Sequence, residues 1–224
     1  MNRRKIIDAM ELSSEAYKNV QPTHPNTTVK IIDHPNGVQC YIRQQGEHMS
    51  ITFRGSDSLR DWKTDLTFWK KVVPYNNTSS KIRVHTGFIN AYKDPGVRDL
   101  IHTYITEDIH CITITGHSYG AALAVLCAVD VEYNFSTKDI EVITFGGPRI
   151  GNNAFVKSYN KRVCKTLRVE NGNDIVTKVP FASWGYHHVG ATIHVGVPRI
   201  FGLFSFHQHY PHEYYKSLIM KFLP

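Results

Sequence analysis

The sequence predicts an α/β protein in which helices cover both faces of a mostly parallel sheet. Short β-branched stretches alternate with helix-forming stretches along the chain, as where residues 112–115 precede residues 121–131. This order is typical of parallel strands that are connected by helices. The 224 residues are 42% hydrophobic, and no repeat or linker divides them. We therefore expect a single domain over residues 1–224 with one large core.

The individual elements follow from the spacing of apolar residues. Residues 3–18 have helical spacing and predict a first helix, and residues 38–43 and 48–53 alternate like two strands around a turn. Further strands are expected at 82–86, 112–115, 141–145, 165–169 and 191–195, and helices from about residue 87, at 121–131, at 153–159 and at 211–222. Sites in such sheets form at the carboxyl ends of the strands, so the residues that follow each strand are the candidates for chemistry.

Charge and composition narrow the class of protein. The net charge of +7 favours an anionic partner, either a nucleic acid or an acidic lipid surface. The basic residues are scattered and no nucleic-acid motif occurs, so we expect no nucleic-acid binding. The sequence has neither a transmembrane run nor a secretion signal, which favours an intracellular or peripheral protein, and we expect a monomer. The four cysteines have no paired spacing and are expected to be free thiols.

One segment carries the clearest catalytic signal. Gly116-His117-Ser118-Tyr119-Gly120 lies between a β-branched strand and an alanine-rich helix. This context places the serine of a Gly-x-Ser-x-Gly pattern on a tight strand-to-helix turn, where side chains at positions 116 and 120 would collide with their neighbours. The helix dipole and the amide of Tyr119 then face an oxyanion formed at Ser118. A turn in which the glycines serve packing alone is the alternative.

Further segments occur in a fixed order around this turn. They are ITFRGS at 51–56, SLRDWKTDL at 58–66, VHTGF at 84–88, TFGGPRIGN at 144–152, NDIV at 173–176 and VP at 179–180. With the serine motif, they resemble the class 3 lipase family, the fungal triacylglycerol lipase type of α/β-hydrolase. The resemblance covers roughly residues 5–220. The family usually has leucine and a second glycine where this chain has Tyr119 and Ala121.

A catalytic serine needs a histidine to accept its proton and a buried carboxylate to orient that histidine. In α/β-hydrolases the chain order is serine, acid, histidine. Asp174 follows the strand at 165–169 after a short Asn-Gly-Asn turn, so we expect it at the carboxyl edge of the sheet as the acid. Its alternative role is to cap the loop through an Asx turn. Glu170 is the second choice, expected as a solvated strand end, and Asp130 is expected to point away on the helix.

The histidine has more candidates than the acid. His117 is adjacent to the nucleophile and is expected to point elsewhere, and His194 is expected to be packed or paired within its strand. The resemblance places the base just before the closing helix, which leaves three residues: His207, His209 and His212. Many relatives have tyrosine five residues after the base and leucine four residues later, which fits His209 with Tyr214 and Leu218. We therefore expect His209, with His207 and His212 as alternatives.

The remaining roles come from the resemblance. It places a second oxyanion donor at Ser56, beside the amide of Tyr119, and gives Arg54 a structural ion pair. It also implies a lid that includes Leu59 and Trp62. No cofactor is expected. We also expect no metal, because no cysteine lies near the paired histidines and no His-Glu-x-x-His occurs.

The resemblance implies hydrolysis of lipid esters, as in a triacylglycerol or other acylglycerol lipase, through an acyl-enzyme. Phospholipase A1 and a soluble carboxylesterase use the same chemistry and stay open as alternatives. An alternative of another class is a lipid-binding protein that keeps the fold without turnover. Trp62, the apolar residues 200–206 and the charge of +7 together predict transient binding to an anionic lipid surface.

Overall fold

A computed structural model describes residues 2–22, 26–56, 71–74, 77–198 and 204–223 of the chain. Its main sheet has the strand order β1-β2-β3-β6-β7-β8-β9. The strands are β1 (Thr28–Asp33), β2 (Gln39–Gln45), β3 (His48–Phe53), β6 (Cys111–His117), β7 (Asp139–Phe145), β8 (Thr166–Asn171) and β9 (Ala191–Val195). All pairings from β3 to β9 are parallel, whereas β1, β2 and β3 pair antiparallel. The short strands β4 (Lys71–Val72) and β5 (Val84–His85) pair with each other.

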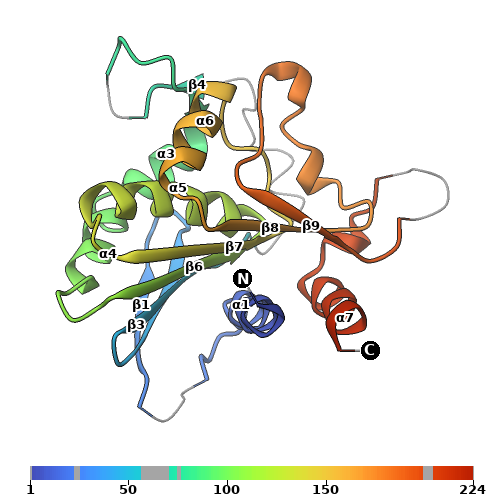
Figure 1. The fold of residues 1–224 in the computed structure, drawn as a ribbon, viewed down its shortest axis with the longest axis horizontal. Helices are drawn as coiled ribbons and strands as arrows, with labels where there is room; N and C mark the ends of the chain where they lie inside the picture. The colour runs from blue at the N-terminus through green and yellow to red at the C-terminus, as the bar shows by residue number, and fades with distance from the viewer. Residues whose placement is uncertain (1, 23–25, 57–70, 75–76, 199–203, 224) are drawn as a thin grey trace.

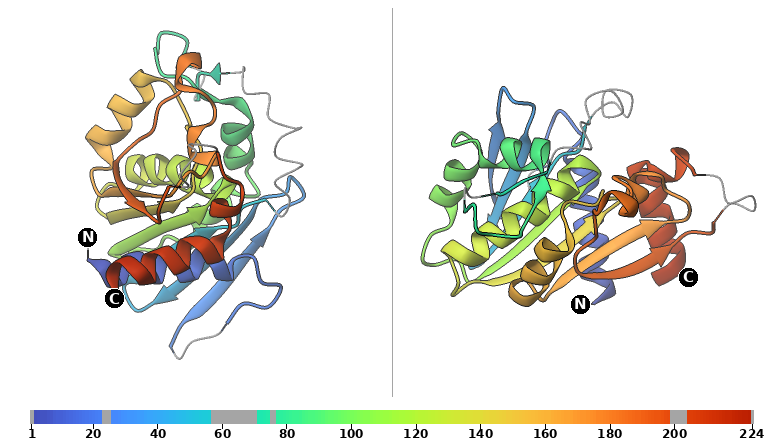
Figure 2. Two further views of the ribbon diagram at one scale, coloured as in Figure 1. Left: turned by 90° about the vertical axis from the view of Figure 1, so that its right-hand side faces the viewer. Right: turned by 90° about the horizontal axis from the view of Figure 1, so that it is seen from above.

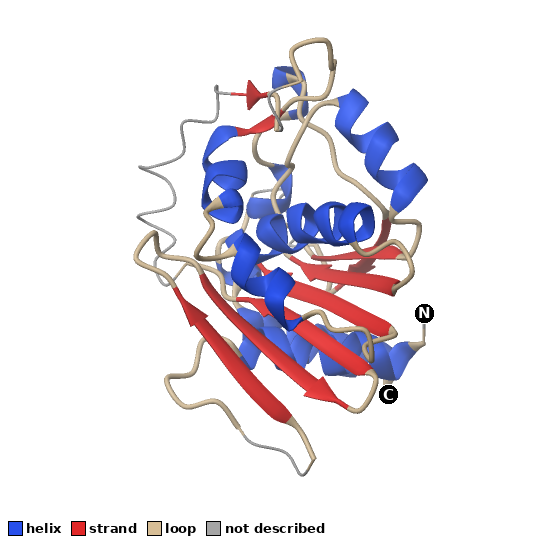
Figure 3. Cartoon of the chain, turned by 90° about the vertical axis from the view of Figure 1, so that its left-hand side faces the viewer, coloured by secondary structure: helices blue, strands red, loops and turns tan. Residues whose placement is uncertain are grey.

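Helices cover both faces of this sheet, as Figures 1 and 3 show. One face carries α3 (Thr86–Lys93), α4 (Arg98–Tyr104), α5 (Tyr119–Asn134) and α6 (Asn153–Arg162). The other face carries α1 (Arg3–Glu15) and α7 (Pro211–Phe222), which lie side by side (Figure 2). Single turns of 3-10 helix form at η1 (Val176–Lys178), η2 (Ala182–Trp184) and η3 (His207–His209). The predicted α/β class with a mostly parallel sheet is confirmed.

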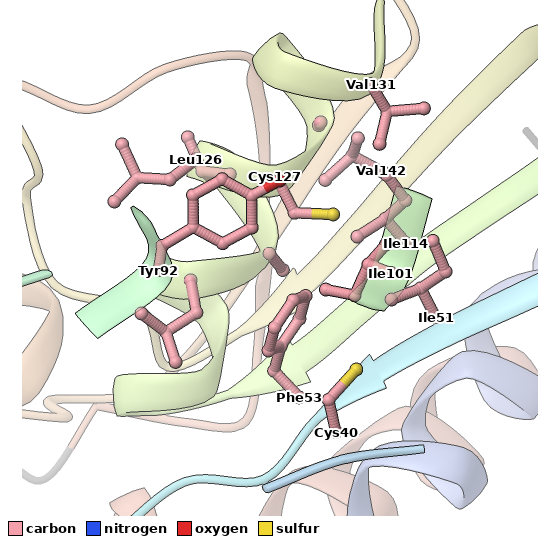
Figure 4. Packing of buried hydrophobic residues seen from close by; sticks show 14 of the residues in the cluster. Cys40, Ile51, Phe53, Tyr92, Ile101, Ile114, Leu126, Cys127, Val131 and Val142 are labelled. Carbon is pink, nitrogen blue, oxygen red and sulfur yellow. The ribbon is translucent and has the colours of Figure 1, made fainter. Parts of the chain in front are cut away.

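Each face of the sheet has its own apolar core because successive side chains of a strand point to opposite faces. In β7, Val142 belongs to the larger core under α5, whereas Ile143 and Phe145 belong to the smaller core under α1 and α7. The helix α5 is buried on nearly all sides, including every residue from 120 to 128, as its continuous apolar sequence requires. Figure 4 shows Leu126 and Cys127 of this helix packed among Phe53, Tyr92 and neighbouring aliphatic side chains.

The sequence reasoning missed some elements and extended others too far. Strand β1 and helix α4 were not predicted, because β1 is an edge strand with a mainly exposed face and α4 has only seven residues. Helix α1 ends at Glu15 instead of continuing to residue 18, and the side chain of Gln21 donates to the freed carbonyl of Glu15 at 3.0 Å. Among the described residues, no helix is both long and apolar enough to cross a membrane.

Candidate active site

Ser118 occupies the turn between β6 and α5. Its backbone has φ 60° and ψ −125°, a conformation that costs roughly 1–3 kcal/mol for a residue with a side chain. Two hydrogen bonds hold it: the Ser118 N–H donates to Phe145 O at 2.9 Å and the Ala121 N–H donates to Ser118 O at 3.0 Å. A Cβ on Gly116 would lie 2.5 Å from the carbonyl of Gly120, and a Cβ on Gly120 would lie 2.2 Å from Phe53 O. The expected collisions at both glycines are therefore real.

The structure brings Ser118, His209 and Asp174 into one hydrogen-bonded line. Nε2 of His209 lies 2.8 Å from Ser118 Oγ, and its Nδ1 lies 2.8 Å from Asp174 Oδ2. Ser118 is the N-cap of α5, Asp174 follows β8 and His209 lies in η3, so all three come from the carboxyl edge of the sheet or a loop beside it. Their exposed fractions are 3%, 1% and 2%, so the line is shielded from water. This arrangement can remove a proton from Ser118 and stabilise the resulting imidazolium.

Asp174 is fixed by two further donors. Its Oδ1 accepts from the Val176 N–H at 2.9 Å, and its Oδ2 accepts from the Tyr214 hydroxyl at 2.6 Å. Burial and the charge of Asp174 raise the pKa of Tyr214 well above its usual value, so the phenol stays protonated as a donor. The Asn171 N–H donates to the same hydroxyl at 3.2 Å. Tyr214 entered the sequence reasoning only through its spacing from His209, and its contact with Asp174 was missed.

His117 supports the backbone of His209 instead of contacting Ser118. Its Nε2 lies 2.7 Å from the carbonyl oxygen of His209, which can only accept, so Nε2 carries the proton. Burial lowers the pKa of His117 well below its usual value, so the ring is neutral and its Nδ1 accepts from the Tyr17 hydroxyl at 2.8 Å. The side chain points away from the nucleophile, as expected, but sequence reasoning missed this link from Tyr17 to His209.

The alternative bases lie elsewhere. The side chains of His207 and His212 are 53% and 69% exposed and face Glu213. His188 is half-buried, with Nε2 2.8 Å from Thr177 O, and loss of solvation lowers its pKa to about 3. His194 was expected to be packed or paired; its side chain is 70% exposed, with Nδ1 3.9 Å from Glu170, so the packed alternative is wrong. Only His209 among these residues contacts Ser118.

The expectation that Glu170 is a solvated strand end is wrong. Its residue is 5% exposed, and its carboxylate pairs with Arg168 at 2.7 Å and Lys178 at 2.9 Å. These two cations lower its pKa to about 2, against the opposing effect of burial. Asp130 points away from the strand ends as expected, but it is buried and accepts from Arg98 and His102, among others.

The two expected oxyanion donors come from different segments, Tyr119 directly after the nucleophile and Ser56 after strand β3. Tyr119 is the first residue of α5, and its N–H is one of the groups at a helix start that have no partner within the helix. Its ring packs edge-on against Phe88, and burial raises the phenol pKa to about 12. Ser56 is half-buried at the end of the segment that leaves β3, and Phe53 of that strand touches the turn at Gly120.

The lid residues and Arg54 are the remaining residues that the resemblance assigned a role. Leu59, Trp62 and most of the apolar stretch at 200–206 lie outside the described residues. Arg54, expected in an ion pair, donates to Gln39 and lies over the ring of Tyr17 with its Cζ 5.8 Å from the centroid.

Comparisons with known proteins agree with this geometry. The family model for lipase (class 3) matches residues 50–184. The chain is 35% identical over 147 residues to the chloroplastic phospholipase A(1) DAD1 of Arabidopsis thaliana, covering 58% of this chain and 33% of that protein. It is also 35% identical over 147 residues to a lipase of Rhizomucor miehei, covering 62% of this chain and 39% of that protein. The chain thus spans a third to two fifths of these relatives' length.

A solved structure supports the same relationship. It is described as a triacylglycerol lipase whose catalytic centre is a serine protease triad, and it superposes with a TM-score of 0.72 at 26% identity. The match covers 86% of this chain and 79% of that one. The family model spans more than half of the chain and contains Ser118 and Asp174. The chain belongs to the class 3 lipase family.

Proposed function

We propose that this protein hydrolyses carboxylic esters of lipids, with Ser118 as nucleophile, His209 as base and Asp174 as the residue that orients the base. One observation carries the proposal: the unbroken hydrogen-bonded line from Ser118 Oγ through both nitrogens of His209 to Asp174, at 2.8 Å in each step. A protein that binds lipid without turnover has no need of a strained, buried serine in contact with an oriented imidazole. The geometry therefore favours an enzyme over the lipid-binding alternative.

The proposed reaction follows from this line. His209 Nε2 accepts the Ser118 proton while Oγ attacks the ester carbonyl, and Asp174 stabilises the imidazolium. The N–H groups of Tyr119 and Ser56 are proposed to hold the oxyanion. His209 then protonates the leaving alcohol, which leaves an acyl group on Ser118. Water, deprotonated by His209, releases the fatty acid and restores the serine. The chain's own residues supply every group that these steps use.

We propose acylglycerols as the substrate class, because the Rhizomucor relative is a lipase and the superposed structure is a triacylglycerol lipase. The 35% identity to a phospholipase A(1) supports phospholipid as the second candidate. A hydrolysis panel separates them: a triacylglycerol emulsion, phospholipid vesicles and a short soluble ester, each with wild type and Ser118→Ala. Release of fatty acid from the emulsion in excess supports the lipase, and release from the vesicles in excess supports the phospholipase. Turnover of the soluble ester alone would indicate a carboxylesterase.

We further propose that the chain acts as a monomeric single domain on a lipid surface. Near His209 in the chain, Phe204, Phe206 and Tyr210 are 57%, 37% and 46% exposed and offer aromatic surface that can enter a lipid interface. The net charge of +7 favours an anionic surface. Vesicle binding that rises with anionic lipid and weakens with salt supports this docking. Equal binding to neutral and anionic vesicles at low salt contradicts its electrostatic part.

A further inference from the structure

Two histidines and a glutamate converge where η3 meets α7, outside the candidate active site. His207 belongs to η3, and His212 and Glu213 lie in the first turn of α7. Nε2 of His212 lies 3.5 Å from Glu213 Oε1, and Nε2 of His207 lies 4.0 Å from the same oxygen. One ligand atom from each of the three side chains lies within 4.8 Å of the other two.

These separations suit a small divalent ion. Zinc binds imidazole nitrogen and carboxylate oxygen at about 2.0–2.2 Å, which puts neighbouring ligand atoms of a tetrahedral site about 3.3 Å apart. The His212–Glu213 separation of 3.5 Å nearly meets this value, and the 4.0 Å separation of His207 needs only a small rotation of its ring. Both histidine side chains are more than half exposed, so the solvent side leaves room for that rotation.

The surroundings partly orient the two rings. Tyr210 stacks on His212 with centroids 5.6 Å apart and an interplanar angle of 15°, and it meets the ring of His207 edge-on at 6.2 Å. Glu213 is the least exposed of the three, with 22% of its side chain accessible. Thus a half-buried carboxylate lies at the base of the cluster, and two imidazoles reach it from solvent. Two histidines and one glutamate, with a fourth position left for water, form a donor set that zinc takes in proteins.

We propose that His207, His212 and Glu213 bind one divalent transition-metal ion, with Zn²⁺ as the best match to the donor set. The ion would link η3 to α7 through ligands that precede and follow His209 in the chain. The sequence predicted no metal because it has neither a nearby cysteine nor a His-Glu-x-x-His helix; this set is instead assembled across a helix junction. The proposal is independent of the proposed ester hydrolysis, since none of the three residues takes part in it.

The test is titration of the full, tag-free chain with Zn²⁺ alone, followed calorimetrically. Exposed thiols can bind zinc on their own, so every protein in the series carries Cys111→Ser and Cys164→Ser. We expect one ion per chain, and at least about tenfold weaker binding in His207→Gln and in His212→Gln. His194→Gln is the matched control, because its side chain is 70% exposed and remote from Glu213 in sequence. It should bind zinc like the parent.

Thermal unfolding gives a second readout, since an ion that binds only the folded chain raises Tm. Zn²⁺ should raise Tm of the parent and of His194→Gln, and leave Tm of the double variant His207→Gln/His212→Gln unchanged. Equal Tm values without zinc show that the exposed substitutions leave the fold intact. Zinc affinity in the double variant equal to that of the control would overturn the proposal, as would a parent that shows no saturable binding.

Discussion

The hydroxyl of Tyr214 lies 2.6 Å from Asp174 Oδ2, the same oxygen that lies 2.8 Å from His209 Nδ1. Oδ2 thus accepts from both side chains, so the phenol helps to fix the carboxylate that orients His209, and the closing helix α7 becomes part of the candidate site. Because Asp174 is 1% exposed, protein groups must satisfy it in place of water. Tyr214 thus links the packing of α7 to the orientation of the proposed base.

Tyr214→Phe removes that donor while keeping the ring. We expect a loss of about 1.5–3 kcal/mol in the free energy of unfolding, as for a hydrogen bond to a charged group, and a lower kcat. Denaturant unfolding and ester hydrolysis measure the two effects. Tyr215→Phe is the matched control, because its neighbouring hydroxyl donates to the exposed Glu11 at 3.1 Å. Equal effects of the two substitutions would contradict the role given to Tyr214.

His117→Leu removes the hydrogen bond to the carbonyl of His209. The imidazole of His209 then loses its backbone anchor, and a displacement of about 1 Å from the reacting serine costs up to about 100-fold in rate. We expect kcat to fall while KM stays near its wild-type value, since His117 acts through the backbone of His209. Tyr17→Phe should act in the same direction but more weakly. A change confined to KM would show that His117 acts on binding instead.

Separate alanine substitutions identify the base. His209→Ala should lower kcat by up to about 10⁶-fold if the three residues act as a unit. His207→Ala and His212→Ala should keep wild-type kcat in metal-free buffer, because their side chains face Glu213 and solvent. Full activity of His209→Ala together with loss in either of the others would move the base to that residue.

Glu170 should make unfolding sensitive to acid. Arg168 and Lys178 hold its folded pKa at about 2, below the ordinary 4.5, while His188 and His194 lie 4.0 and 3.9 Å away. A depressed carboxylate pKa stabilises the fold above the unfolded pKa, so this contribution, of order 3 kcal/mol, is lost as pH falls from about 5 to 2. Glu170→Gln should flatten the pH dependence of Tm in that window, whereas exposed Glu107→Gln should leave it as in wild type. An unchanged profile in Glu170→Gln would refute the assignment.

The sequence predicted those parts of the molecule that depend on neighbouring residues. The turn at Ser118 follows from two glycines, a β-branched strand and an apolar helix, all within a short segment. Parallel order places Asp174 at the carboxyl edge, and family spacing favours His209 but leaves His207 open, since other relatives have the tyrosine three residues after the base, as Tyr210 follows His207. Contacts between distant segments were not predictable: Tyr17 and His117 are 100 residues apart, and His117 and His209 are 92 residues apart. Only the packing of α1 against α7 and β6 brings them together.

The edge strand β1 and the burial of Glu170 were also not predicted from the sequence. In β1, Ile31 is 57% exposed while Ile32 is 2% exposed, so two adjacent apolar residues hide the alternation that marks a strand. Arg168 lies two residues before Glu170 on the same face of β8, so this pair was open to sequence reasoning and was overlooked. Lys178, eight residues after Glu170, reaches it only once the loop after β8 has folded back.

Ser118 is proposed to be an activated nucleophile, and fluorophosphonate labelling tests this activation most directly. The serine oxygen displaces fluoride from phosphorus and His209 takes the proton, so labelling needs both residues. Peptide mass spectrometry of the labelled chain should find one phosphonyl group, on Ser118, in wild type. Ser118→Ala should remain unlabelled and His209→Ala should react far more slowly, while exposed Ser79→Ala should label like wild type. Label on another residue, or an unlabelled wild-type chain that is folded, would contradict the account.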